Sequence, residues 1–113
     1  MARLDRKRFS DRVRHRLVET LPAGGVEAGK VARALNLSLR TLQRRLAGED
    51  TTWSELLDQA RHELALRFIG ERRMSVKEAT YVLGFSEPAN FTRAFRRWTG
   101  RSPTEYRRAA ARR

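Results

Sequence analysis

Side chains that can pair with base edges gather on one face of the segment 39–47. With Leu42 and Leu46 placed inward, a turn of about 100° per residue sets four polar side chains on the opposite face, behind a serine at the predicted N-cap. These residues are Ser38, Arg40, Thr41, Gln43 and Arg44. Arginine can pair bidentately with guanine and glutamine with adenine, each worth ~1–3 kcal/mol of discrimination. The face therefore predicts reading of the DNA major groove, with a solvated arginine-rich face as the alternative.

A second segment, 87–99, is divided into an apolar and an outward face in the same way, and Phe91, Phe95 and Trp98 point inward. The outward residues are Ala89, Thr92, Arg93 and Arg96, with Pro88 at the helix start. Because Pro88 and Ala89 lack hydrogen-bonding side chains, this helix is expected to read DNA mainly through Arg93, Thr92 and contacts with thymine methyl groups. The aromatic stripe could stack on single-stranded bases, but its i, i+4, i+7 spacing is typical of a core.

Two helix-turn-helix-like patterns must position these faces. In each pattern a short helix ends on a residue that tolerates positive φ, an apolar residue fills the turn, and a serine is expected to cap the next helix. The corresponding pairs are Asn36 and Gly84, Leu37 and Phe85, and Ser38 and Ser86. Phe91 falls seven residues after its turn residue, whereas Leu42 falls six after its own, so the second turn is predicted to be slightly longer. The duplication favours sequence-specific DNA binding.

Capping signals predict an all-α fold of about seven helices. The S/T-x-x-E boxes at Thr52, Ser75 and Ser102 mark helix starts, and Gly48, Gly70 and Gly100 mark helix ends. The predicted helices span about 10–21, 27–35, 39–47, 53–69, 76–83, 87–99 and 103–110. We expect one domain, 1–113, with helix-turn-helix lobes at about 10–50 and 75–110. The helix 53–69 carries an apolar stripe that would pack against both lobes.

The charge of the chain favours a polyanionic partner. Among 113 residues, 25 are Lys or Arg and 13 are Asp or Glu, which leaves a formal net charge of +12. A compact domain of this charge repels itself, and nucleic acid is the leading candidate for a compensating partner. Lysine occurs only at Lys7, Lys30 and Lys77, so 25 − 3 = 22 of these residues are arginine. A G·C-rich genome is an equally good explanation of that excess, so the prediction depends on position instead.

Other classes of function have little support in the sequence. The chain has no cysteine, which excludes disulfides, thiol catalysis and cysteine-bound zinc. His15 and His62 lack the spacing of metal ligands and are expected at the surface. No catalytic motif is present, so we expect no enzyme, no cofactor and no metal. The sequence also lacks a signal peptide and an apolar run of the ~20 residues that would cross a membrane, which predicts a cytoplasmic protein.

From about residue 26 to residue 107 the chain resembles the DNA-binding domain of the AraC/XylS family of bacterial transcription regulators. The resemblance is carried by the run Thr-Leu-Gln-Arg-Arg-Leu at 41–46, Gly84-Phe85-Ser86, Phe91, the run Ala-Phe-Arg-Arg at 94–97, Gly100, Ser102-Pro103 and Tyr106-Arg107. These elements occur in order at spacings similar to those of the family. Three departures are Thr80, where the family usually has alanine, His62, where it has a small apolar residue, and Pro88-Ala89. The first two are expected to loosen packing.

The resemblance implies two lobes joined by a long helix, with the segments 39–47 and 87–99 entering successive major-groove segments of one DNA face. It assigns base contacts to Arg40, Gln43 and Arg44 in the first lobe and to Pro88, Ala89, Thr92 and Arg93 in the second. It also implies transcription activation through RNA polymerase. The similarity is greater to members with a large N-terminal domain, so we expect a C-terminal fragment that lacks an effector-binding or dimerisation domain. A stand-alone domain is the alternative.

Two other classes of function compete with this interpretation. A nonspecific architectural or RNA-binding protein would explain the charge, but it has no need of two base-facing helices at a fixed separation. A DNA-repair alkyl transferase with an AraC-like segment would need a cysteine acceptor, which this chain lacks.

Overall fold

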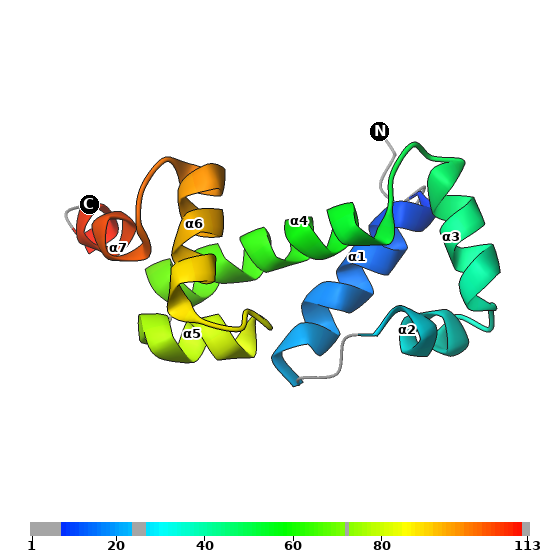
Figure 1. The fold of residues 1–113 in the computed structure, drawn as a ribbon, viewed down its shortest axis with the longest axis horizontal. Helices are drawn as coiled ribbons and strands as arrows, with labels where there is room; N and C mark the ends of the chain where they lie inside the picture. Colours follow the sequence, from blue (N-terminus) through cyan, green and yellow to red (C-terminus); the bar gives the residue numbers. More distant parts are fainter. Residues whose placement is uncertain (1–7, 24–26, 72, 112–113) are drawn as a thin grey trace.

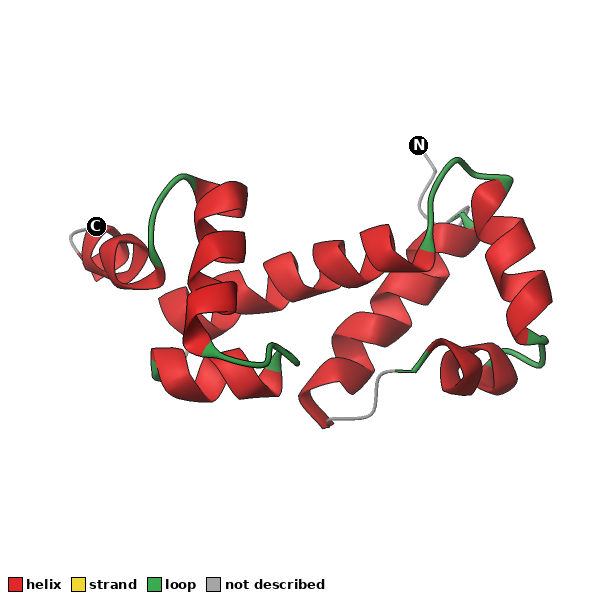
Figure 2. Ribbon diagram, in the orientation of Figure 1, coloured by secondary structure: helices red, strands yellow, loops and turns green. Residues whose placement is uncertain are grey.

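A computed structural model describes residues 8–23, 27–71 and 73–111, and within these ranges the chain forms seven α-helices and no strand (Figure 2). The helices are α1 (Phe9–Thr20), α2 (Ala28–Ala34), α3 (Leu39–Ala47), α4 (Trp53–Leu66), α5 (Val76–Val82), α6 (Pro88–Thr99) and α7 (Pro103–Ala111). A short 3-10 turn at Leu21–Ala23 follows α1, and a π-helical turn at Arg67–Glu71 follows α4. The predicted all-α class is confirmed.

Helix α4 bridges two groups of helices (Figure 1). The first lobe, α1 to α3, lies at one end of α4, and the second lobe, α5 to α7, lies at the other end. The molecule measures 43 × 37 × 22 Å along its principal axes. Helices α3 and α6 stand at opposite ends and run in similar directions in this view. The two lobes joined by a central helix, as predicted, therefore form a flattened molecule.

One apolar core runs through both lobes by way of α4. Leu56, Ala60 and Leu64 of α4 are buried one turn apart and belong to the same cluster as residues of α1 and α6. In the first lobe this cluster includes Leu42 and Leu46 of α3, both fully buried. Complete burial of a leucine contributes ~1.5–3 kcal/mol, so the predicted inward face of α3 is held firmly.

Aromatic rings fill the second lobe. Phe91 and Phe95 of α6 are fully buried. The Phe95 ring lies 5.3 Å from that of Tyr106 on α7, and Phe91 lies 5.5 Å from Phe85 in the turn before α6. These separations fall in the range favoured by aromatic pairs. The stripe on α6 is therefore a core, as its spacing predicts.

The end of the central helix differs from the prediction. Regular α-helix stops at Leu66, and Gly70 lies within the π-helical turn instead of ending the helix. The Arg107 guanidinium donates to the carbonyl oxygens of Ile69, at 3.0 Å, and Met74, which ties this turn to α7. A Cβ at Gly70 would lie 3.3 Å from the Tyr106 ring. This glycine allows close approach of α7, a contact that local sequence signals do not reveal.

The capping boxes and turn residues follow the sequence closely. Thr52, Ser75 and Ser102 each accept a hydrogen bond from the backbone N–H of the glutamate three residues later, and that glutamate accepts one in return. The two helix-turn-helix turns contain left-handed residues, Asn36 at φ 60° and Gly84 at φ 88°. Both predictions are confirmed.

Replacing Gly84 by alanine is expected to destabilise the fold by about 1–2 kcal/mol, because a left-handed backbone is unfavourable for a residue with a Cβ. The free energy of unfolding from urea titration measures the effect. Gly29→Ala is the matched control. A Cβ at Gly29, inside α2, meets no atom within 4 Å, so this change is expected to stabilise by roughly 0.5–1 kcal/mol. Equal effects of the two substitutions would contradict the role given to the turn.

Candidate nucleic-acid interface

Helix α3 presents a polar face that its own cap helps to fix. Ser38 is the N-cap, as predicted, and its Oγ accepts from the Thr41 backbone N–H at 3.1 Å. The Ser38 hydroxyl also donates to Thr41 Oγ1 at 3.0 Å. Thr41 is half-buried, so it lies at the flank of the face and its hydroxyl is engaged in the cap.

Three long polar side chains remain on the exposed surface of α3. Arg40, Gln43 and Arg44 are all exposed, opposite the buried Leu42 and Leu46. Within residues 8–23, 27–71 and 73–111, none of these three side chains makes a hydrogen bond or an ion pair with another residue. Their donors are therefore available to an incoming ligand.

Helix α6 presents a different face. Pro88, Ala89, Arg93 and Arg96 are exposed, and Thr92 is half-buried. The Arg93 guanidinium donates to the Asn90 side chain, one turn earlier. Asn90 was missed in the sequence, although its i, i+3 spacing to Arg93 is a detectable signal. Gly100, at φ 80°, ends the helix as predicted.

The expected serine cap of α6 is wrong. Glu87, not Ser86, is the N-cap residue, and no side chain caps this helix. Because the second turn has one extra residue, Ser86 lies one position before the N-cap. Its hydroxyl instead accepts a hydrogen bond from the Asn90 side-chain amide at 2.8 Å. Asn90 thus contacts both the turn and Arg93.

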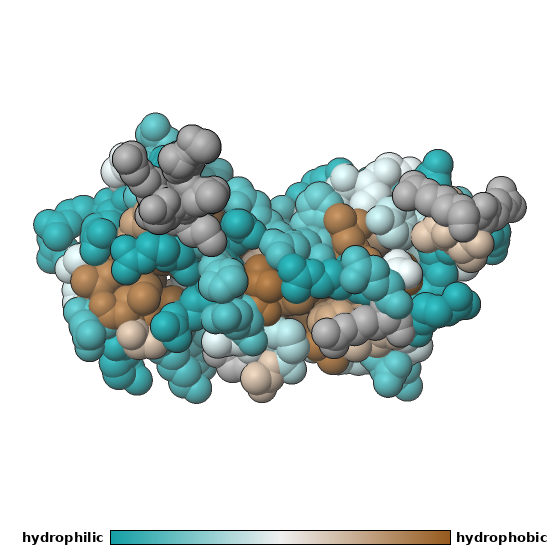
Figure 3. Space-filling view, turned by 180° about the vertical axis from the view of Figure 1, so that it is seen from behind, coloured by the Kyte–Doolittle hydropathy of each residue, from teal (hydrophilic) through white to brown (hydrophobic). Residues whose placement is uncertain are grey.

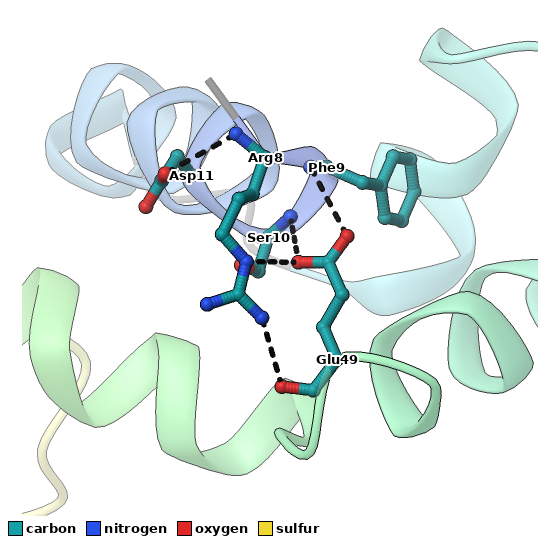
Figure 4. Close-up of polar contacts among 5 residues, drawn as sticks. All are labelled: Arg8, Phe9, Ser10, Asp11 and Glu49. Atoms are coloured by element: carbon teal, nitrogen blue, oxygen red, sulfur yellow. Dashed lines mark hydrogen bonds and ion pairs between the residues drawn. The ribbon is translucent and has the colours of Figure 1, made fainter. Parts of the chain in front are cut away.

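A carboxylate from the loop after α3 anchors this helix to α1. The Glu49 carboxylate accepts from the backbone N–H groups of Ser10, at 3.0 Å, and Phe9, at 3.2 Å (Figure 4). The Arg8 guanidinium lies 3.4 Å from the same carboxylate and donates to the Glu49 carbonyl oxygen. On α3 itself, the Arg45 guanidinium stacks 3.9 Å above the Phe9 ring. These contacts fix the first turn of α1 against the end of α3.

This environment lowers the pKa of Glu49. A hydrogen bond from the Ser10 side chain is the largest cause, burial opposes it, and the Ser10 and Phe9 backbone N–H groups and the Arg8 charge add to it. Hydrogen bonds to a charged carboxylate favour the charged form, as does a helix N-terminus. Because Glu49 and Ser10 are separated by 39 residues, no local pattern in the sequence indicates this anchor.

His62 and Thr80 correct two expectations. His62 is half-buried rather than superficial, and its ring stacks on Trp98 at a centroid distance of 5.1 Å and an angle of 8°. Thr80 is fully buried, and its hydroxyl donates to the Val76 carbonyl oxygen at 2.7 Å. Each of the two residues thus has a specific partner. His15 is exposed and lies 3.3 Å from Glu19.

The described residues meet neither the requirements of a metal site nor those of a membrane-spanning helix. Hydrophilic residues cover most of the face seen from behind, and apolar residues show at the first lobe and near the middle (Figure 3). Among the residues that the structure describes, no group of three His, Cys, Asp or Glu side chains could hold a metal ion. None of the described helices is long and apolar enough to span a membrane.

Comparisons with known proteins agree with this geometry. A family model described as a helix-turn-helix domain matches residues 31–109. The ornithine utilization regulator of Pseudomonas aeruginosa is 40% identical over 94 residues, which cover 83% of this chain and 28% of that regulator. The chain thus spans less than a third of the length of this relative.

Two solved structures extend the similarity to the fold. One is a DNA-binding transcriptional dual regulator from Escherichia coli K-12, 27% identical, with a TM-score of 0.85 over all of both chains. The other is the DNA-binding domain of AdpA, a global transcriptional factor solved in complex with a target DNA. It is 28% identical, with a TM-score of 0.73 over 95% of this chain and 97% of that one.

Glu49→Gln is expected to lower the free energy of unfolding at pH 7 and to flatten its decline in acid. A depressed pKa in the folded state contributes stability above the ordinary value of 4.5, and this stability is lost as the pH falls through the folded pKa. Urea titrations between pH 7 and pH 3 test the expectation. Glu19→Gln is the control with the same charge change, because its pair with His15 is exposed. Identical pH profiles for the two variants would contradict the anchor.

Proposed function

This chain belongs to the AraC-type family of helix-turn-helix transcription regulators, which bind DNA, and we propose that it recognises its site by inserting α3 and α6 into successive major-groove segments. The observation that carries the proposal is that α3 and α6 lie at opposite ends of α4 (Figure 1) and that each has an exposed face. In this arrangement two lobes of one chain read one face of a duplex.

We propose that α3 supplies most of the base reading. Arg40, Gln43 and Arg44 have unengaged donors, and Gln43 and Arg44 match the bidentate geometry of adenine and guanine. Ser38 and Thr41 lie at the start and flank of the helix, where contact with a phosphate is expected. Arg45 is committed to Phe9 and serves the fold instead.

Helix α6 is proposed to read fewer bases. Arg93 is aligned by Asn90 and can reach a guanine, while Pro88, Ala89 and the Thr92 methyl group suit apolar contact with thymine. Arg96 is exposed further along the helix and is assigned to a phosphate. The second block of the site should therefore tolerate more base changes than the first.

The dimensions of the molecule support recognition of adjacent groove segments. Successive major-groove entries on one face lie about 34 Å apart, and the longest dimension here is 43 Å. Any remaining mismatch would be met by bending the DNA, at a cost of order 1–6 kcal/mol. A positive charge of +12 would add sequence-independent affinity for phosphates.

The rest of the regulator is inferred from its relatives. Because the chain covers only 28% of the Pseudomonas regulator, we infer that it is the C-terminal part of a longer protein with an effector-binding or dimerisation domain. A stand-alone domain is the alternative, and the solved chain of the E. coli regulator is matched over its whole length. We further propose activation through contact with RNA polymerase in the bacterial cytoplasm, which a promoter-reporter strain with and without the gene would test.

Selection of genomic fragments with the purified chain at about 150 mM salt tests DNA recognition, since specific and nonspecific binding separate at physiological salt. We expect an asymmetric site with two short blocks about one helical turn apart. Competition with scrambled DNA should then favour the selected site by about 10³-fold or more. Equal competition would contradict the proposal and leave nonspecific, charge-driven binding as the function.

Arg44→Ala and Arg44→Lys separate base reading from phosphate contact. Both changes remove the planar fork, so each is expected to weaken the selected site by about 1–3 kcal/mol and to relax the preference at one position of the first block. Only Arg44→Ala removes charge, so only a phosphate contact would make the salt slopes of the two variants differ by about 1. Full affinity and preference in Arg44→Lys would show that Arg44 acts as a simple charge.

A further inference from the structure

One side of α4 contacts the second helix-turn-helix through three residues spaced i, i+3 and i+4. Asp58, Arg61 and His62 lie on this side: Asp58 and His62 contact the end of α6, and Arg61 contacts the turn before it. Their spacing places them on one face of the helix. We name these three residues the α4 latch.

Asp58 contacts the last turns of α6. Its carboxylate accepts from both terminal nitrogens of Arg97, at 3.0 and 3.2 Å, and from the Trp98 indole N–H at 3.1 Å. The bond from Arg97 is the main reason why the pKa of Asp58 is lowered. A bidentate guanidinium and an indole N–H on one carboxylate define an orientation as well as a distance.

Arg61 holds the turn before α6. Its guanidinium donates to the carbonyl oxygens of Leu83, at 2.8 Å, and Gly84, at 3.3 Å. The same guanidinium lies 4.7 Å from the centre of the Phe85 ring, which fills the turn. Burial lowers the pKa of Arg61, and Asp58 opposes that shift. Helix α4 therefore holds the turn that precedes α6 through Arg61 and the last turns of α6 through Asp58.

His62 contacts the same end of α6 as Asp58, through ring stacking. Its ring lies parallel to the Trp98 indole, and Trp98 is bonded in turn to Asp58. Aliphatic packing between helices tolerates rotation and sliding, whereas stacked rings and bidentate bonds have a preferred geometry. The three contacts together resist rotation of α6 about the axis of α4.

We propose that the α4 latch sets the number of base pairs between the two blocks of DNA that the chain recognises. One base pair corresponds to a rotation of about 35° and a rise of 3.4 Å along the duplex. A second lobe held at a fixed angle to the first can satisfy only one spacing. This inference rests on the proposed function, and it makes Asp58, Arg61 and His62 positioning residues that touch no DNA.

Asp58 and Arg97 are exposed enough that their contact can be removed without a large loss of folding stability. The side chains of Asp58 and Arg97 are 41% and 60% exposed, and ion pairs of this kind contribute little to folding. Removing the Asp58 carboxylate is therefore expected to leave the chain folded. The orientation of α6 relative to α4 should, however, become less well defined.

The test uses the duplex selected by the chain and two derivatives with one base pair inserted or removed between the blocks. The unmodified chain should lose about tenfold or more in affinity on either derivative, because a shift breaks the base contacts of one lobe. The variants Asp58→Asn and Asp58→Ala/His62→Ala should bind the parent duplex more weakly and lose about threefold or less on the derivatives. Circular dichroism melting confirms that each variant is folded.

Glu63→Ala is the matched control. Glu63 is also an acidic residue of α4 with arginine partners, since Arg14 and Arg67 each lie 2.6 Å from its carboxylate, and neither of these partners belongs to α6. This variant should keep the full tenfold penalty for altered spacing. An unchanged penalty in the Asp58→Asn chain, while it still binds the parent site, would overturn the latch alone. Failure to select any site would overturn the proposed function instead.

Discussion

The structure depends on the packing of one face of α4 against both lobes. Leu56, Ala60 and Leu64 are buried along the helix, and the core they belong to continues from α1 to α6. Ala60 and Ala65 are fully buried small residues, which lets neighbouring helices approach α4 closely. Without this shared core, two lobes of this size would bury too little surface to stay folded or to keep a fixed distance.

Directional contacts then orient α3 and α6 on this common axis. Both lobes use a carboxylate together with an arginine stacked on an aromatic ring. In the first lobe Glu49 binds the start of α1 and Arg45 covers Phe9, while in the second Asp58 binds the end of α6 and Arg61 covers Phe85. A chain with 13 acidic residues and a net charge of +12 thus places these two carboxylates where orientation matters, while Arg40 and Arg44 on the described surface of α3 have no hydrogen-bond or ion-pair partner. This division supplies rigidity and positive potential at once.

The sequence predicts features that depend on neighbouring residues and misses contacts between residues far apart in the chain. The capping boxes, the left-handed residues and the apolar stripes act over three to seven residues, and the seven helices follow from them. The Ser86 cap failed because one extra residue in the turn changes the position that counts as the cap. The π-helical turn, the partner of His62 and the Glu49 anchor each depend on residues 33 to 41 positions away, which no periodicity encodes. The exposure of Arg40, Gln43 and Arg44 agrees with the helical wheel. Burial of Leu42 and Leu46 fixes the rotation of α3 about its axis, and this rotation decides which side chains face solvent.

The two helices that we propose to read DNA, α3 and α6, differ in how ordered their exposed side chains are. The exposed side chains of α3 are free, so each must be ordered on binding, at a cost of about 0.5–1.5 kcal/mol per side chain that good base pairing can exceed. Arg93 on α6 is already held by Asn90, and Pro88 is rigid, so the second lobe loses less entropy but also adapts less. A lobe with little adaptability makes its contacts only where its backbone is placed correctly. In the proposed complex, the contacts between α4 and α6 therefore bear on recognition as directly as the residues assigned to the bases.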